Sequence, residues 1–164
     1  MSAGFDWDAD ECGLGTVDAG GRVFLIAALG DCPDARAAAA EWCAQAIALG
    51  RTATVLSGAD TDAVREAVDG ARAGSRVMLA GAERDLMAAV AAVRAAGALP
   101  SEVTTHLTVR GGVAVFCPHC ATAQDAAVAP GGRVRCATCG TVLEVRSHRS
   151  SHHGTYLGAV AEAA

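Results

Sequence analysis

The stretch Val23-Phe24-Leu25-Ile26-Ala27-Ala28-Leu29-Gly30-Asp31-Cys32-Pro33 decides the fold. Its first seven residues form a continuous apolar run, which is typical of a strand buried on both faces of a sheet. Pro33 suits the first turn of a helix, and Asp31 or Cys32 suits the cap before it. The alanine-rich helix that follows is expected to end near Gly50, because glycine is a common helix stop.

The same strand–helix unit recurs along the chain. Two more helices with a 3.6-residue apolar period are expected, the first beginning at Asp60 or Thr61 and ending by Gly74, the second ending at Gly97. The further strands are expected at 52–57, 76–81 and 103–109. Because strands and helices alternate through short connections, the sequence predicts an α/β fold. It would have a small parallel sheet of about four strands with flanking helices.

Beyond Gly111-Gly112 the helical pattern disappears and a cysteine pattern begins. Its four members follow the spacing C-x2-C, fifteen residues, C-x2-C, and they are Cys117, Cys120, Cys136 and Cys139. Two residues between thiols let one turn direct both sulfurs at a single ion, and two such turns complete a tetrahedron. Disulfides or free thiols are the alternative. Seven cysteines in a reducing compartment favour metal.

Short β-like runs at 113–116, 133–135 and 141–145 surround these cysteines. This is the layout of a C-terminal zinc ribbon, rubredoxin-like, in which the ion substitutes for a core too small to fold alone. A closed site of four cysteines is usually structural, whereas iron there would carry one electron. Rubredoxin-type knuckles usually have glycine after the second cysteine. Gly140 follows Cys139, but Ala121 follows Cys120, and this mismatch favours zinc, with iron as the alternative.

Charge and hydropathy limit the function classes. Residues 1–112 contain fifteen acidic and nine basic side chains, residues 113–164 contain three and four, and the chain has no lysine. An acidic body disfavours nucleic-acid binding, which requires a basic surface. No apolar run is long enough to span a membrane, and the acidic N-terminus does not have the pattern of a signal sequence. A cytoplasmic location is expected.

The sequence disfavours two further kinds of site, a nucleotide site and a second metal site. The first strand–helix loop has a single glycine, Gly30, and Asp31 would repel a pyrophosphate, so no bound NAD(P) or flavin is expected. His148, His152 and His153 are candidates for a second metal site. Adjacent side chains such as those of His152 and His153 diverge on a helix or a strand, which favours a solvated or interface role.

The chain is therefore expected to have four parts. These are an acidic lead-in at 1–20, an α/β domain at 21–111, a four-cysteine metal ribbon at 112–147, and a tail at 148–164 that docks on a partner.

The α/β part resembles the pyridine-nucleotide half of the ferredoxin reductase family. The resemblance lies in the runs 76–83, 89–90 and 96–103, where Ala80-Gly81-Ala82 stands in place of the family's Cys-Gly-Pro. Gly30 and Pro33 echo the family's glycine-rich loop, whose other glycines are missing. Because these departures fall on cofactor-contacting positions, the resemblance implies a degenerate nucleotide-binding domain retained as a scaffold.

A second resemblance covers most of residues 23–160. Cys-Pro-x-Cys, Cys-x-x-Cys-Gly and a final His-x-Ser…Gly-x-Tyr-Leu-Gly are similar to the small metal-ribbon subunit of bacterial dimethylamine monooxygenase, an oxidative N-demethylase complex. The matching tail positions are His148, Ser150, Gly154, Tyr156, Leu157 and Gly158. The family usually has two arginines and an apolar residue between the serine and the glycine, where this chain has Ser151, His152 and His153.

The second resemblance implies a non-catalytic subunit of an NADPH-dependent amine monooxygenase. Its partners would be a haem-binding catalytic subunit and a reductase subunit with flavin and an iron–sulfur cluster. The substrates would be methylated amines, which are oxidised with oxygen to a demethylated amine and formaldehyde. Gly154, Tyr156, Leu157 and Gly158 would insert into a partner, with Tyr156 at the contact because tyrosine is favoured in interface cores.

Overall fold

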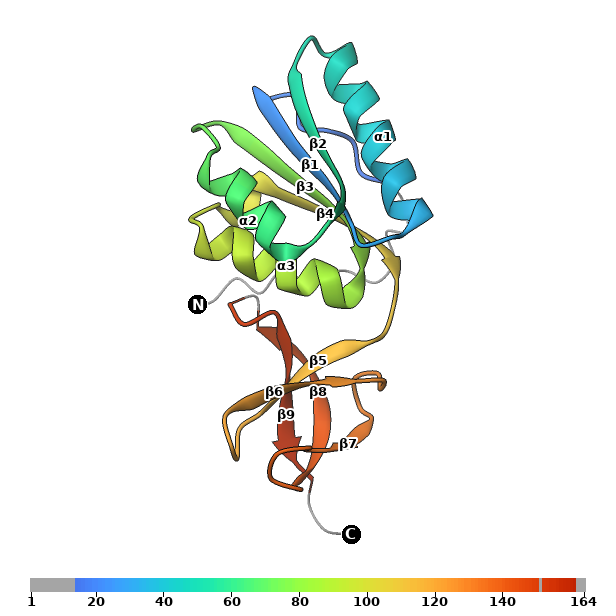
Figure 1. Ribbon diagram of the computed structural model, residues 1–164, viewed down its shortest axis with the longest axis vertical. Coiled ribbons are helices and arrows are strands. Elements are labelled where there is room, and N and C mark those ends of the chain that lie inside the picture. Colours follow the sequence, from blue (N-terminus) through green and yellow to red (C-terminus); the bar gives the residue numbers. More distant parts are fainter. Residues whose placement is uncertain (1–13, 151, 162–164) are drawn as a thin grey trace.

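The computed structural model describes residues 14–150 and 152–161, and in these the chain forms two separate sheets (Figure 1). The first sheet has the strand order β2-β1-β3-β4, and every pair in it is parallel. Its strands are β1 (Val23–Leu29), β2 (Thr52–Ala59), β3 (Ser75–Ala82) and β4 (Val103–Val109). The predicted α/β class with a four-stranded parallel sheet is confirmed.

Helices cover both faces of this sheet (Figure 1). They are α1 (Pro33–Ala48), α2 (Thr61–Asp69), α3 (Glu83–Ala95) and the short 3-10 helix η1 (Pro100–Glu102). Helix α2 ends at Asp69, before the predicted stop at Gly74. Asp60 caps it by accepting a hydrogen bond from the backbone N–H of Ala63 at 2.8 Å. Each of the three α-helices follows a strand of the parallel sheet, as the alternating pattern predicts, and η1 lies between α3 and β4.

The side chains of β1 alternate between two cores. Phe24 and Ile26 point to the face covered by α1, where they pack in one cluster with the fully buried Trp42. Leu25 and Leu29 point to the opposite face, which α2 and α3 cover. Because burying each large apolar side chain stabilises by roughly 1.5–3 kcal/mol, the two clusters give this half of the chain its own core.

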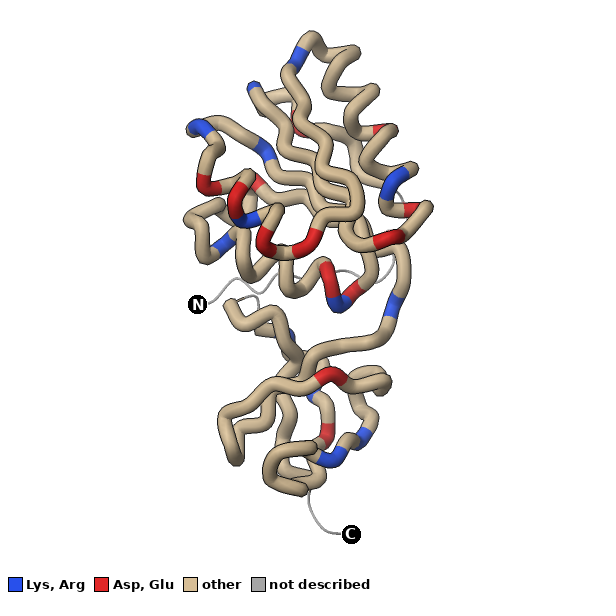
Figure 2. Tube along the Cα trace, viewed as in Figure 1, with Lys and Arg blue, Asp and Glu red and all other residues tan. Residues whose placement is uncertain are grey.

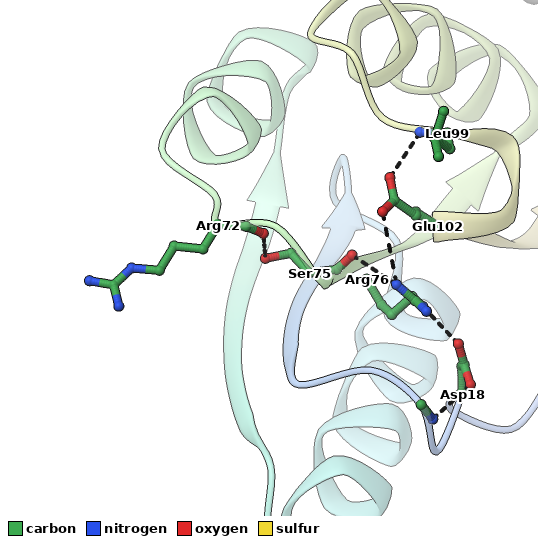
Figure 3. Close-up of polar contacts among 7 residues, drawn as sticks. Asp18, Arg72, Ser75, Arg76, Leu99 and Glu102 are labelled. Carbon is green, nitrogen blue, oxygen red and sulfur yellow. Dashed lines mark hydrogen bonds and ion pairs between the residues drawn. The ribbon is translucent and has the colours of Figure 1, made fainter.

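Arg76, at the start of β3, joins three segments at the amino ends of the strands (Figure 3). Its Nε donates to the Asp18 carboxylate at 2.7 Å, and its NH1 lies 4.0 Å from Glu102 of η1. The Arg76 hydrogen bond lowers the pKa of Asp18 from its ordinary value, and the backbone N–H of Gly20 adds to this effect. This network fixes the edge of the sheet that faces away from the second sheet.

The second sheet has the strand order β6-β5-β9-β8-β7. Its strands are β5 (Val113–Cys117), β6 (Thr122–Ala126), β7 (Arg133–Arg135), β8 (Val142–Ser150) and β9 (Thr155–Val160). The three β-like runs that the sequence showed are strands, whereas β6 and β9 were not predicted. Its core contains Val115, Leu143 and Val145, with Met87 of α3 in the same cluster.

The segment predicted as a tail differs from that expectation. Residues 148–150 continue β8, and β9 lies inside the sheet, paired parallel to β5 and antiparallel to β8. The physical reason is the alternation along β9, which places Tyr156 and Gly158 on the buried face. Most of the acidic lead-in, residues 1–13 with Cys12, lies outside the described residues, as do Ser151 and residues 162–164.

The described end of the lead-in packs against α1. The Trp42 indole N–H donates to the backbone carbonyl of Gly15 at 2.7 Å, and the Gln45 side chain accepts from the Val17 N–H at 3.1 Å. Across residues 14–150 and 152–161, no helix combines the length and the apolar character that a membrane span requires.

Candidate metal centre

The second sheet brings the four predicted cysteines together. Cys117 ends β5 and Cys120 lies in the turn that follows, while Cys136 follows β7 and Cys139 lies in the turn before β8. All four sulfurs lie within 4.8 Å of one another, with Cys117 Sγ 3.8 Å from Cys139 Sγ and Cys120 Sγ 3.6 Å from Cys136 Sγ. A tetrahedral zinc site with Zn–S bonds of about 2.3 Å needs sulfurs about 3.8 Å apart, so the geometry fits one ion.

The four sulfurs are of two kinds. Cys117 and Cys136 are buried, while Cys120 and Cys139 are partly exposed. Burial raises the pKa of the Cys117 thiol to about 11, and a hydrogen bond with the Thr141 hydroxyl, followed by one with its backbone N–H, lowers the pKa of Cys139. A bound metal ion requires deprotonated sulfurs, so metal binding would release the proton of Cys117. Four close cysteine sulfurs are a donor set that zinc and iron both accept.

The two knuckles have the same backbone shape although their sequences differ. Ala121 adopts a positive φ of 56°, and Gly140 occupies the matching position after Cys139 with φ 74°. In the part of the chain that the structure describes, Ala121 is the one non-glycine residue with positive φ. The mismatch at Ala121 therefore does not alter the knuckle, and it does not distinguish zinc from iron.

This conformation gives a first prediction. Replacing Ala121 by glycine should stabilise the protein by roughly 1 kcal/mol, because a Cβ at positive φ is strained by about that amount. The midpoint of urea unfolding, measured at constant zinc concentration, reports the change. Gly140→Ala is the matched control and should destabilise by a similar amount. A lower midpoint for Ala121→Gly would contradict this account of the knuckle.

The carboxyl ends of the parallel strands are the usual place for a ligand in such a sheet, at the point where the strand order reverses. Here that point lies between β1 and β3. The first turns of all three α-helices are acidic at this edge (Figure 2), and the acidic residues there are Asp31, Asp34, Asp60, Asp62, Glu83 and Asp85. Carboxylates suit helix N-termini. Arg36 and Arg65 form ion pairs with Asp31 and Asp62, and the excess of carboxylates over arginines at this edge disfavours an anionic pyrophosphate.

Glu83, the first residue of α3, links the two sheets. It is only 6% exposed, and its two carboxylate oxygens accept hydrogen bonds from the Tyr156 hydroxyl on β9 and from the Gly111 backbone N–H at 3.0 Å. Burial, and next the contact with Glu83, raises the pKa of Tyr156 to about 12. The tyrosine therefore remains a proton donor at neutral pH. The role of Glu83 was not predicted from the sequence, because its partners lie 28 and 73 residues away in the chain.

The four residues predicted to dock on a partner contact this chain itself. Gly154 has φ 63° and leaves no room for a side chain, since a Cβ there would lie 2.8 Å from the Met87 carbonyl oxygen. A Cβ on Gly158 would lie 2.9 Å from the carbonyl oxygen of Phe116. Tyr156 is buried, and Leu157 is the one of the four whose side chain is partly exposed. Docking through these residues stays a prediction.

The three histidines are exposed and lie around the turn between β8 and β9. The His153 ring stacks on Phe116 at 6.1 Å, and the His152 ring meets His153 edge-on at 4.7 Å. Among the described residues, the four cysteines are the group of metal-binding side chains that comes together.

Comparison with known proteins agrees with the second resemblance. Residues 114–159 match the family model described as the dimethylamine monooxygenase subunit DmmA-like, C-terminal domain. The chain is also 44% identical over 93 residues to the heme-dependent oxidative N-demethylase delta subunit of Ectopseudomonas mendocina (strain ymp), across 57% of this chain and 52% of that protein. The chain thus spans about half the length of that relative. No solved structure is significantly similar. The resemblance to this kind of subunit is confirmed.

Proposed function

Because residues 114–159 match the DmmA-like C-terminal domain, we propose that the chain is a non-catalytic subunit of a multi-subunit oxidative N-demethylase. The observation that carries this proposal is the cluster of four sulfurs within 4.8 Å, which lies inside the matched residues 114–159. Cys117, Cys120, Cys136 and Cys139 would hold a structural zinc ion.

The closed ligand set supports a structural role for the ion. Four thiolates satisfy a tetrahedral zinc ion and leave no coordination position for a substrate. When bound, zinc would supply a fixed cross-link between the knuckle after β5 and the knuckle before β8. The core of this sheet is small, and two of its most buried members are Cys117 and Cys136 themselves. The cross-link would therefore contribute much of the free energy that folds this sheet.

A second candidate is electron transfer through iron bound by the same four sulfurs. Two observations favour it. Cys120 and Cys139 are partly exposed, and the Cys117 and Cys136 sulfurs accept hydrogen bonds from backbone N–H groups within their own knuckles. Such bonds stabilise negative charge on an iron–thiolate centre, and an exposed edge gives electrons a route to a partner.

The partners we propose are a haem-binding catalytic subunit and a reductase subunit with flavin and an iron–sulfur cluster. The complex would oxidise methylated amines with NADPH and oxygen and release formaldehyde. The relative's name includes both haem and a subunit designation, which supports this assignment. The α/β domain, residues 21–111, would act as a docking scaffold rather than bind NADPH, since its carboxyl edge is acidic. We also propose a cytoplasmic location.

The proposal is tested by reconstitution. The tagged haem-binding subunit is co-expressed with the reductase subunit and with this chain, and methylamine formation is measured with dimethylamine. We expect full activity to require this chain, and the isolated chain to oxidise no NADPH. Full activity without it, or NADPH oxidation by the chain alone, would contradict the proposal.

The two metals are distinguished in the same assay. Full activity with the zinc-loaded chain supports the structural role, whereas activity restricted to the iron-loaded chain supports electron transfer. Cys43→Ser is the control for changing a cysteine outside the metal site, because Cys43 lies in α1, far in sequence from the knuckles. It should give the same activity as the unmodified chain.

A further inference from the structure

The two knuckles share a longer pattern than the four cysteines. Cys117-Pro118-His119-Cys120-Ala121-Thr122 and Cys136-Ala137-Thr138-Cys139-Gly140-Thr141 both read C-x-x-C-x-T. In each, the positive-φ residue before the threonine turns the chain back toward the metal centre. The Thr122 hydroxyl lies 3.1 Å from Cys120 Sγ, and the Thr141 hydroxyl lies 3.3 Å from Cys139 Sγ. Each knuckle thus places a threonine hydroxyl beside the sulfur of its second cysteine.

These contacts fall on one kind of sulfur. Cys120 and Cys139, the second cysteine of each knuckle, are partly exposed and each has a threonine hydroxyl beside it. Cys117 and Cys136 are buried, and backbone N–H groups of their own knuckles interact with their sulfurs, as the Thr141 N–H does with Cys139. The hydroxyls therefore lie beside the sulfurs of the two partly exposed cysteines.

The direction of these hydrogen bonds follows from the chemistry of a bound ion. A metal-bound thiolate has no proton, so the hydroxyl must donate to the sulfur. The Thr122 hydroxyl donates to the Thr138 hydroxyl at 3.3 Å in this structure. With a thiolate at Cys120 it would turn to donate to the sulfur and would accept from Thr138 instead. A donor on a thiolate withdraws electron density from it, and this lowers its reactivity toward electrophiles.

We propose that Thr122 and Thr141 are positioning residues of the metal centre, and that their hydroxyls hold and protect the thiolates of the two partly exposed cysteines, Cys120 and Cys139. The inference rests on the proposed metal site and goes beyond it, because it assigns the resistance of that site to electrophiles and oxidants to two residues that are not ligands. The threonines would thus decide how long the ion stays bound when the exposed edge is attacked.

The test is the rate of zinc release when the zinc-loaded full chain is treated with N-ethylmaleimide, followed with a coloured chelator. Thr122→Val and Thr141→Val remove the hydroxyl at nearly constant size. Each is expected to release zinc at least about threefold faster than the wild type, and the double variant faster still. Thr54→Val is the matched control, because Thr54 is an exposed strand residue of the first sheet. Its rate should equal that of the wild type.

Serine variants separate the effect of losing the hydroxyl from the effect of changing the side-chain packing. Thr122→Ser and Thr141→Ser keep the donor and should release zinc at the wild-type rate, whereas the alanine variants should match the valine variants. Equal rates for the double valine variant and the wild type would overturn the inference, as would serine variants as fast as alanine variants. A wild-type chain that holds no metal would overturn the proposed function as well, so metal content before treatment distinguishes the two failures.

Discussion

Replacing Cys136 by serine is expected to remove the metal and unfold the second sheet while the first sheet stays folded. Cys136 is 1% exposed and belongs to the small core of the second sheet. Zinc binding contributes about 10–16 kcal/mol to the folding of small zinc modules, and losing one of four ligands removes most of it. The first sheet has two apolar cores of its own, one on each face, and none of the four cysteines belongs to either.

Amide hydrogen exchange measured by mass spectrometry, together with zinc content, reports this result. Protection should disappear in peptides from β5 to β9 and persist in β1, β3 and α1. Removal of zinc with a chelator should give the same pattern in the wild type. Cys43→Ser is the control and should keep one metal ion per chain and full protection. Retained protection of β5 and β9 in Cys136→Ser would show that the ion does not hold this sheet together.

Truncating Tyr156 to alanine should destabilise the protein by about 3–5 kcal/mol, the usual cost of removing a large buried aromatic side chain. Tyr156 is 3% exposed, packs in the core of the second sheet, and donates its hydroxyl hydrogen bond to Glu83 at the start of α3. Its loss should therefore weaken the attachment of one sheet to the other. Urea unfolding and limited proteolysis between Val109 and Val113 measure the two effects.

Milder variants separate the hydrogen bond from the packing. Tyr156→Phe should cost about 1.5–3 kcal/mol, the range for hydrogen bonds to charged groups, and Glu83→Gln should cost less because its amide oxygen can still accept. A double-mutant cycle of Tyr156→Phe with Glu83→Ala gives the coupling between the two side chains. A coupling near zero would show that the contact does not link the sheets. Tyr156→Ala should also be tested for complex assembly, because unchanged assembly would make the predicted partner contact wrong.

The first sheet was predictable because its signals are local. The apolar run Val23–Leu29 and the helix stops at Gly50 and Gly97 are properties of neighbouring residues, and the strands and helices lie where these signals place them. The spacing of the four cysteines likewise predicted their convergence, since a C-x2-C turn fixes two sulfurs within four residues.

Strand β9 and the contact between Glu83 and Tyr156 were not predictable in this way. Within β9, Gly158 and the neighbouring small residues weaken the strand signal, and the strand is stabilised by pairing with β5 and β8. Gly154, Tyr156 and Gly158, which the sequence assigned to a partner surface, make contacts inside the chain. Glu83 shows the same limit, since only the folded chain brings it to Tyr156, 73 residues away.

Ala121 shows a different limit of prediction from sequence. In the sequence, the difference between Ala121 and Gly140 favours zinc over iron, yet both residues adopt positive φ, at 56° and 74°. The surrounding sulfur cluster and strands impose the conformation, and the alanine bears the strain. The choice between zinc and iron therefore depends on chemistry that the backbone does not record.

Metal content by mass spectrometry, with a visible spectrum, on the full chain purified without added metal tests the central claim most directly. The account predicts one zinc ion per chain and a colourless protein, which Cys136→Ser no longer binds. One iron ion per chain with a thiolate-to-iron absorption band would contradict the structural role and establish an electron carrier. A chain that holds no metal while both sheets stay folded would contradict the metal centre itself.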